Sequence, residues 1–454
     1  MQRAGEQITG TVPATRYSEA VPRYTSYPTA PHFHAGIGAE TFRGWLQQTG
    51  SSDDVSLYVH IPFCDRLCWF CACHTKMTRR YEPVAAFLDA LLSEIKTVGN
   101  VLDGNGRIRA LHFGGGSPTM LRPEDVLRLG AALKDAFNFA DDAEISVELD
   151  PNDMDDARFD AFAAIGMTRA SLGVQDFDPK VQTAINREQT FEQTRGVVDG
   201  VRARGVHSVN LDLLYGLPHQ TLESVADTIR QALTLSPDRI ALFGYAHVPW
   251  FKKHQTMIDE AFLPGPEERF AQQQETARII REAGYQTIGL DHFAKPDDPL
   301  AVAAREGRLF RNFQGYTEDA CRTLIGLGPS SVSRLPQGYA QNTPATANYE
   351  RIVSEGGLAT ARGIALSEED QARAWVIERL MCDFAFSGEE AIRLFGECGR
   401  RIVSEARQAD EEAGLVEDGG TFSLRDEARP LVRSTAALFD QYLKRGGARH
   451  SAAV

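Results

Sequence analysis

Long apolar runs and cysteines are both scarce in this sequence. No segment of the 454 residues approaches the ~20 apolar residues that a membrane-spanning helix needs. Residues 1–20 contain no apolar stretch like that of a secretory signal, so we expect a cytoplasmic protein without a membrane partner. The seven cysteines are an odd number, and four of them are crowded together, which does not suit a disulfide framework. Clustered cysteines in a reducing compartment usually indicate metal or redox chemistry.

Positive charge is also in deficit. The chain has 48 Lys and Arg against 62 Asp and Glu, which gives a formal net charge of −14. Proteins that bind nucleic acid need a basic surface, so we expect no nucleic-acid partner. The net charge still allows a local basic pocket for a small anionic substrate. No heptad pattern is evident, and we therefore expect a monomer.

Short apolar runs alternate with helical segments from about residue 55 to about residue 290. Buried parallel strands have this composition, so six or seven successive strand–helix units predict a parallel α/β sheet, either open or curled toward a barrel. The helical period is clear over residues 83–98, where Val84, Phe87, Leu91, Leu92 and Ile95 share one face. The predicted strands are "VSLYVHI", "RIRALHF", "EISVEL", "RASLGV", "SVNLDLLY", "RIALFGYAHV" and "YQTIGL".

The rest of the chain has a different character. Residues 1–50 read as an arm that covers a site, and residues 51–300 as the core barrel. Residues 301–364 are expected to connect and close the site, and 365–442 to form a small, mostly helical domain similar to a winged helix. We expect residues 443–454 to be a disordered tail.

The sulfur is concentrated in "CDRLCWFCACH", directly after the first predicted strand. Cys64, Cys68 and Cys71 form a C-x3-C-x2-C pattern whose thiolates can converge on one metal centre. A [4Fe–4S] cluster with three protein ligands would leave one iron open to a small molecule. Zinc completed by Cys73 or His74 is an alternative, although no second cysteine pair supports it. Free thiols are the remaining interpretation. The other cysteines are scattered, at Cys321, Cys382 and Cys398.

The C-x3-C-x2-C loop, with an aromatic residue before its third cysteine, resembles that of the radical S-adenosylmethionine (SAM) enzymes. Over about residues 20–435 the chain more narrowly resembles the family of oxygen-independent coproporphyrinogen III oxidases, or coproporphyrinogen dehydrogenases. Ala72 and His74 depart from the family's usual "CGCN", while the cysteines are kept. The motifs that carry the resemblance are "PRYTSYPT", "YVHIPFC", "GGGSPTML", "VELDP", "GVQDF", "INREQ", "NLDLLYGLP", "YAHVPW", "GLDHFAKPDD" and "NFQGYT".

The resemblance implies a partial (β/α)6 barrel of the TIM type, with an N-terminal arm and a small C-terminal domain. It also implies a [4Fe–4S] cluster on Cys64, Cys68 and Cys71, and two SAM sites. At the cluster, SAM would yield methionine and a 5′-deoxyadenosyl radical that removes a hydrogen from the β-carbon of a propionate. Loss of CO2 and one further electron would leave a vinyl group. Two such steps convert coproporphyrinogen III to protoporphyrinogen IX, in haem biosynthesis, with an unidentified electron donor and acceptor.

The resemblance assigns the first SAM to residues near the cluster. Gly115, Gly116 and Ser117 would hold its methionine end, although glycines here also suit a tight strand-to-helix turn. Glu148 would accept its ribose hydroxyls, the alternative being a helix cap. Tyr58 would lie beside SAM and substrate as a catalytic residue, the alternative being an ordinary core tyrosine.

The second nucleoside site would use Gln175, Arg187 and Asp212. Taken alone, Arg187 is more typical of a surface ion pair, and Asp212 of a helix cap. Phe70 and Ala246 would contact adenosine groups, with Val332 as a weaker assignment. Cys73 resembles a fourth family cysteine that accompanies catalysis without binding the cluster, and its alternative is a small buried residue. Three residues of the N-terminal arm could help to close the site but are not counted among the predicted site residues: Arg23, Tyr24 and Tyr27.

Other functions stay open at this point. A haem-trafficking relative would keep the barrel, yet such relatives typically lack the arm and the second cysteine of "CxC", and this chain has both. Another radical enzyme, such as a methyltransferase or a haem-degrading relative, is a second alternative. A non-catalytic zinc-binding interaction protein is the third. The colour of protein purified without oxygen separates the last from the others, because a cluster protein is brown.

Overall fold

A computed structural model describes residues 21–409 and 414–443. Its main sheet has twelve strands in the order β16-β15-β14-β13-β1-β4-β5-β6-β7-β8-β10-β9. The seven strands from β13 to β8 run parallel, and the strands outside them are antiparallel. In chain order, the first six parallel strands are β1 (Asp54–Ile61), β4 (Arg107–Gly115), β5 (Phe139–Leu149), β6 (Arg169–Gln175), β7 (Ser208–Tyr215) and β8 (Arg239–Gly244).

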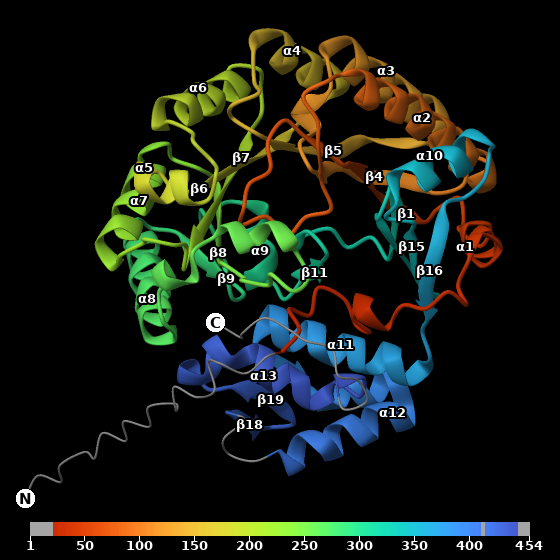
Figure 1. Cartoon of the computed structure of the whole chain (residues 1–454). Coiled ribbons are helices and arrows are strands. Elements are labelled where there is room, and N and C mark those ends of the chain that lie inside the picture. The colour runs from red at the N-terminus through yellow and green to blue at the C-terminus, as the bar shows by residue number, and fades with distance from the viewer. Residues whose placement is uncertain (1–20, 410–413, 444–454) are drawn as a thin grey trace, which may run out of the picture.

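Each of these six strands is followed by one or two α-helices that cover the outside of the sheet (Figure 1). The helices bury the apolar faces that their sequences present; in α2, for example, Val84, Phe87, Leu91 and Ile95 are almost fully buried. The predicted α/β fold with parallel strands is thereby confirmed. The helices are α2 (Glu82–Leu102), α3 (Pro123–Ala136), α4 (Asp156–Ile165), α5 (Pro179–Ala184), α6 (Phe191–Arg202), α7 (Leu222–Thr234) and α8 (Pro266–Glu282).

The seventh predicted strand, "YQTIGL", is not part of a seventh parallel unit. It forms β9 (Gln286–Ile288), which pairs antiparallel with β10 (His292–Ala294) at the edge of the sheet. The seventh parallel strand is instead β13 (Thr323–Leu327), which returns to pair with β1. Around it lie α9 (Pro299–Arg305), the hairpin of β11 (Phe310–Asn312) and β12 (Gly315–Thr317), the antiparallel strands β14 (Val332–Leu335), β15 (Gly338–Asn342) and β16 (Thr360–Ala365), and α10 (Thr346–Ser354).

The C-terminal region lies below the barrel in Figure 1 and is mostly helical. A three-stranded sheet, β17-β19-β18, packs beside its helices. None of the helices within residues 21–409 and 414–443 is long and apolar enough to cross a membrane. The elements are α11 (Glu368–Asp383), β17 (Ala385–Ser387), α12 (Gly388–Gln408), β18 (Leu415–Asp418), β19 (Thr421–Leu424), η7 (Asp426–Leu431), α13 (Val432–Ala436) and η8 (Ala437–Phe439).

The described part of the N-terminal arm packs against this C-terminal region. Tyr24 donates a hydrogen bond to Asp440 (3.1 Å), and Tyr27 accepts one from the amide of Gln441 (3.2 Å). Both tyrosines are buried among the C-terminal helices. The arm continues through η2 (Ala30–His32) and α1 (Ala39–Leu46). Residues 1–20, and the expected tail from residue 444 onward, lie outside the described residues.

Candidate active site

The cysteine loop leaves the carboxyl end of the barrel, directly after β1 and the short strand β2 (Phe63–Cys64). β2 pairs with β3 (Lys76–Met77), so the two ends of the loop are held side by side. All four cysteines of the loop are free: Cys68 is buried, Cys64 and Cys71 are half-buried, and Cys73 is exposed. Parallel α/β sheets place their chemistry at this edge of the sheet.

The spacing of the sulfurs favours a cluster over a single zinc ion. Four ligands at a tetrahedral zinc lie about 3.8 Å apart, given Zn–S bonds of about 2.3 Å. Within the described residues, the one set of three or more Cys, His, Asp or Glu side chains with ligand atoms inside 4.8 Å is Asp65, Asp150 and Asp153. The sulfurs of Cys64, Cys68 and Cys71 therefore do not all lie within 4.8 Å of one another. Three thiol donors around one loop fit a [4Fe–4S] cluster, whose irons each take a separate cysteine.

Segments from two other parts of the chain hold the loop from either side. On one side, Trp69 donates its amide to Ile185 O (2.9 Å), and Asn186 donates its side-chain amide to Leu67 O (2.9 Å). These bonds fix the middle of the loop to the segment after α5.

On the other side, the short helix η4 (Lys253–Met257) and the residue before it contact three stretches of loop backbone. Lys252 donates to Cys73 O (2.9 Å), His254 to Cys71 O (2.7 Å) and Gln255 to Phe70 O (2.9 Å). Because a carbonyl only accepts, the bonding nitrogen of His254 carries a proton. The same Gln255 amide donates to Ala246 O (3.2 Å) and thereby ties two expected nucleoside contacts, Phe70 and Ala246, together.

Arg187 lies behind the loop and is buried, with 8% of its surface exposed. Its guanidinium contacts Asp150 (2.9 Å), Gly173 O (2.8 Å) and the sulfur of Cys68 (3.7 Å). Burial alone would lower the pKa of Arg187, but Asp150 and the neighbouring thiols raise it, so the group stays charged. The interpretation of Arg187 as a surface ion pair is therefore wrong, since the pair is internal and beside a cluster cysteine.

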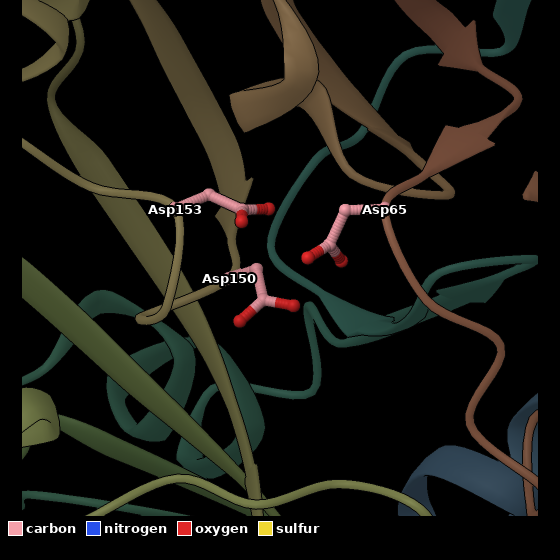
Figure 2. A group of neighbouring side chains, drawn as sticks. All are labelled: Asp65, Asp150 and Asp153. Carbon is pink, nitrogen blue, oxygen red and sulfur yellow. The ribbon is translucent and has the colours of Figure 1, made fainter. Parts of the chain in front are cut away.

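Three carboxylates converge between the loop and the end of β5 (Figure 2). Their oxygens already accept hydrogen bonds or ion pairs. Asp65 pairs with Arg66 (2.8 Å), Asp150 with Arg187, and Asp153 accepts from Thr119 (3.2 Å) while lying 3.6 Å from Arg66. Burial, first, and then the charge of Asp150 raise the pKa of Asp153 to about 6. We interpret the group as structural support for the cluster loop.

The glycine segment after β4 makes close backbone contacts with the cysteine loop. A Cβ on Gly116 would lie 2.6 Å from Phe63 O. A Cβ on Gly115, which has φ of +116°, would lie 2.6 Å from the ring of His60. Ser117 is buried, and its hydroxyl bonds Thr119 (2.5 Å). The segment continues directly into a short helix, η3 (Pro118–Met120). It therefore also forms the tight strand-to-helix turn that was the alternative interpretation of these glycines.

Glu148 and Asp212 face a cavity of about 260 Å³ inside the barrel. Neither caps the helix that follows, because Asp155 caps α4 and Thr221 caps α7, so the helix-cap interpretation of both is wrong. Glu148 accepts from the amide of Gly115 (3.1 Å) and contacts His112 Nε2 (3.1 Å). Asp212 accepts from Ser171 (3.1 Å) and Asn210 (2.7 Å).

The two acids have opposite pKa shifts. Burial would raise the pKa of Glu148, but the hydrogen bond and charge of His112 and the Gly115 amide lower it below its ordinary value. Burial, followed by the charge of Glu148, raises the pKa of Asp212 to about 6. Glu148 is therefore the carboxylate that stays ionised near neutrality, and Asp212 is poised to gain a proton in weak acid.

Tyr58 belongs to a hydrogen-bonded chain that ends at the cysteine loop. His60 Nε2 contacts His74 O (2.9 Å), which requires the proton on Nε2 and leaves Nδ1 as an acceptor. The hydroxyl of Tyr58 therefore donates to His60 Nδ1 (3.0 Å). The ring of Tyr58 also stacks on His112 at 5.8 Å. Burial, then the charge of Glu148, raises the pKa of Tyr58, and burial lowers that of His60 to about 4, so both are neutral.

The remaining expected residues lie around the same edge of the sheet. Gln175 ends β6 with a left-handed backbone (φ 66°). Val332 begins β14; its carbonyl approaches Gly326, which is the register partner of Tyr58. Cys73 donates its amide to the sulfur of Cys71 (3.4 Å), so it lies next to a proposed ligand while its own surface is exposed.

Several residues of this arrangement were not singled out in the sequence, among them His60, His112, Asp150 and Gln255. His60 and His112 stand two positions after Tyr58 and two before Gly114, so the alternation of β1 and β4 carried a usable signal. Asp150 stands two positions after Glu148 in "VELDP", and nothing in that local sequence indicates that it pairs with Arg187. Nothing in the local sequence of Gln255 indicates that it reaches the cysteine loop, which lies far away along the chain.

Comparison with known proteins agrees with this geometry. Residues 58–232 match the family model of the radical SAM superfamily. The chain is 48% identical over 441 residues to the oxygen-independent coproporphyrinogen III oxidase of Paracoccus denitrificans, covering 96% of this chain and 97% of that one. It is 47% identical to the protein of the same name from Bradyrhizobium diazoefficiens, over 96% of this chain and 98% of that one.

A solved structure extends the likeness to three dimensions. The coproporphyrinogen III oxidase of Escherichia coli, described as a radical SAM enzyme, superposes with a TM-score of 0.88 at 37% identity. The match covers 93% of this chain and all of that one. It therefore includes the barrel and most of the C-terminal region.

Proposed function

The chain belongs to the family of oxygen-independent coproporphyrinogen III oxidases, within the radical SAM superfamily, and from this premise we propose how its residues divide the work. The reaction is the oxidative decarboxylation of two propionates of coproporphyrinogen III to vinyl groups, which gives protoporphyrinogen IX for haem biosynthesis. The cofactors are a [4Fe–4S] cluster and SAM. With them bound, one-electron cleavage of SAM supplies a 5′-deoxyadenosyl radical that removes a hydrogen from the propionate β-carbon.

Cys64, Cys68 and Cys71 are the proposed cluster ligands. The single observation that carries this assignment is their placement as free cysteines on one anchored loop. Arg187 positions the loop, because its contact with Cys68 and its pairing with Asp150 tie a ligand to the end of β5. The charge of Arg187 also offsets part of the negative charge that a thiolate-bound cluster carries.

The first SAM is proposed to lie between the glycine segment and Glu148. An ionised carboxylate accepts both hydroxyls of a ribose, and Glu148 is held ionised beside the half-buried Gly115 and Gly116. Tyr58 is proposed to face the reacting groups. Its hydroxyl proton is directed to His60, so its oxygen keeps lone pairs that can accept a hydrogen bond from a reacting group.

A second SAM is proposed beside Phe70, Gln175, Asp212 and Ala246. Two features support it: Gln255 holds the carbonyls of Phe70 and Ala246 together, and Asp212 faces the cavity without capping a helix. The resemblance also gives Arg187 to this second site, which stays a proposal beside its role at the loop, and gives Val332 as a weaker contact with adenosine groups. Cys73 is proposed to accompany catalysis without binding the cluster. The division into arm, barrel, connecting segment and C-terminal domain, the cytoplasmic location and the monomeric state are part of the same proposal.

An anaerobic assay with reconstituted protein tests this function. Coproporphyrinogen III, SAM, a reductant and an electron acceptor should give protoporphyrinogen IX, with methionine and 5′-deoxyadenosine appearing in step with CO2. Tyr58→Phe should keep the iron and SAM binding of the wild type and lose most of the activity, because only a hydroxyl is removed. Tight haem binding without any vinyl product would instead identify a trafficking protein. SAM cleavage without decarboxylation would leave a radical enzyme with another substrate.

A further inference from the structure

A second cavity, of about 300 Å³, opens beside the carboxyl ends of β7 and β8. Four arginines line it, and each comes from a different part of the chain. Arg23 lies in the N-terminal arm, Arg269 in α8, Arg311 in β11 and Arg433 in α13. The cavity thus exists only where arm, barrel and C-terminal region meet, and we call it the arginine cavity.

The charges that line the arginine cavity are strongly unbalanced. Among the described residues that line it there are four guanidinium groups and one carboxylate, Asp291. That carboxylate is already paired with His292 Nδ1 at 2.7 Å. Such an excess of positive charge is costly in a partly buried site unless an anion neutralises it. The positive charge of this lining also contrasts with the chain as a whole, whose formal net charge is −14.

The hydrogen bonds of Arg23 and Arg269 position these two guanidinium groups without neutralising them. Arg23 donates to Gly244 O (3.1 Å) and Arg269 to Tyr245 O (2.9 Å). Main-chain carbonyls fix the direction of a guanidinium and leave its charge in place. Burial is the first cause that lowers the pKa of Arg433, to about 10, and the charges of Arg23 and Arg311 lower it further.

Arg311 carries the most direct sign of a missing ligand. It is 8% exposed, and its Nε and Nη1 are buried without a hydrogen-bond partner. Its Nη2 is 3.4 Å from Arg23 O, and its guanidinium lies over the ring of Tyr316 at 4.4 Å. Buried donors are normally satisfied, because each unmade hydrogen bond destabilises the fold. Nε and Nη1 lie on different edges of the guanidinium, so each can donate separately to an oxygen of a carboxylate.

We propose that the arginine cavity binds propionate side chains of the porphyrinogen that are not reacting. This rests on the proposed function, in which the substrate carries four propionates around one macrocycle. The cavity adjoins the proposed reaction site, since Ala246 lines it and Phe243 is shared with the cavity that holds Glu148 and Asp212. Anchoring the distant carboxylates there would present another propionate to Tyr58. Arg23 also gives the arm a direct part in substrate recognition.

Binding measurements on the cluster-loaded protein test the proposal, with two stable porphyrins as probes. Coproporphyrin III has four propionates, whereas mesoporphyrin IX has two propionates and two ethyl groups in place of the others. Arg269→Gln and Arg311→Gln should each weaken the binding of coproporphyrin III at least about tenfold and that of mesoporphyrin IX much less, because a charge-assisted carboxylate contact is lost. Arg278→Gln, at an exposed ion pair on the same helix α8, should change neither.

The carboxylate of SAM is the other anion that the arginine cavity would accept, so SAM affinity is measured on the same variants by calorimetry. We expect it to be unchanged. A loss of SAM affinity with normal porphyrin binding would overturn the proposal and assign the cavity to SAM. Equal binding of coproporphyrin III by Arg269→Gln and the wild type would also overturn it. Conversion of coproporphyrinogen III by the wild-type protein is assayed in parallel. If the wild type converts the substrate but the arginine variants bind coproporphyrin III normally, only the arginine proposal is refuted. If the variants lose porphyrin binding but the wild type shows no conversion, only the proposed function is refuted.

Discussion

Replacing Gln255 by leucine should loosen the cysteine loop although Gln255 is not a cluster ligand. The side chain has no exposed surface and makes three hydrogen bonds, to Phe70 O, to Ala246 O and from the amide of Val248 (2.6 Å). Leucine fills a similar volume and removes all three. Each lost neutral hydrogen bond costs about 1 kcal/mol, so local opening of the loop should become easier by about 3 kcal/mol, or roughly a hundredfold.

Hydrogen exchange of the segment 64–78 in the cluster-loaded protein measures this opening, and the rate of iron loss to a chelator provides a second readout. Both rates should rise steeply in Gln255→Leu, while Gln274→Leu, at an exposed position on α8, should match the wild type. Gln255→Glu adds a sharper test. It keeps an acceptor for Val248 but presents a carboxylate to two carbonyls, so it should be at least as harmful as leucine. If Gln255→Glu behaves like the wild type, the reasoning about these hydrogen bonds is refuted.

Three further predictions concern the ligands themselves. The iron–sulfur absorption should be abolished in each of the variants Cys64→Ala, Cys68→Ala and Cys71→Ala. Cys73→Ala should keep most of the iron and lose activity. Equal iron loss in Cys73→Ala would mean that the ligands are wrongly assigned. Glu148→Ala should weaken SAM binding at least about tenfold by calorimetry, because a charged acceptor contributes ~1.5–3 kcal/mol, and unchanged affinity would remove Glu148 from the SAM site. Because burial raises the pKa of Asp212 to about 6, its carboxylate is lost as the pH falls through that value, and binding of the second SAM should weaken roughly fourfold between about pH 7.5 and about pH 5.5. Asp212→Asn should bind with the same, weaker affinity at both pH values; a pH dependence that persists in this variant would assign the titration to another group.

The barrel and the cluster loop could be predicted from the sequence because their signals are local. Apolar runs such as that of β1 are buried on both faces, and four cysteines crowded into one loop indicate metal or redox chemistry without any knowledge of the fold. The seventh parallel strand, β13, gave no such signal. It is only five residues long, it follows a stretch in which the strand–helix alternation fades, and its partner β1 lies more than 250 residues earlier. Sequence periodicity does not reveal pairing at that separation.

The same limit applies to the site. Glu148 and Asp212 were ambiguous because an acid at a strand end also suits a helix cap, and only the structure shows that Asp155 and Thr221 take that role. Nothing in the local sequence of Arg311 distinguishes it from a surface arginine. Its importance comes from three other arginines that reach the same cavity from distant parts of the chain. A charge that is balanced or unbalanced by tertiary neighbours has no signature within a window of sequence.

The most direct test of the central claim follows one hydrogen atom. Coproporphyrinogen III deuterated at the propionate β-carbons is incubated anaerobically with the reconstituted protein, SAM, a reductant and an acceptor, and the 5′-deoxyadenosine is analysed by mass spectrometry. If the site assembled by Tyr58, Glu148 and the cysteine loop presents a propionate β-carbon to the radical, deuterium should appear in 5′-deoxyadenosine together with vinyl product. Unlabelled 5′-deoxyadenosine accompanied by full conversion would contradict the account, because the hydrogen would then have been removed by another group.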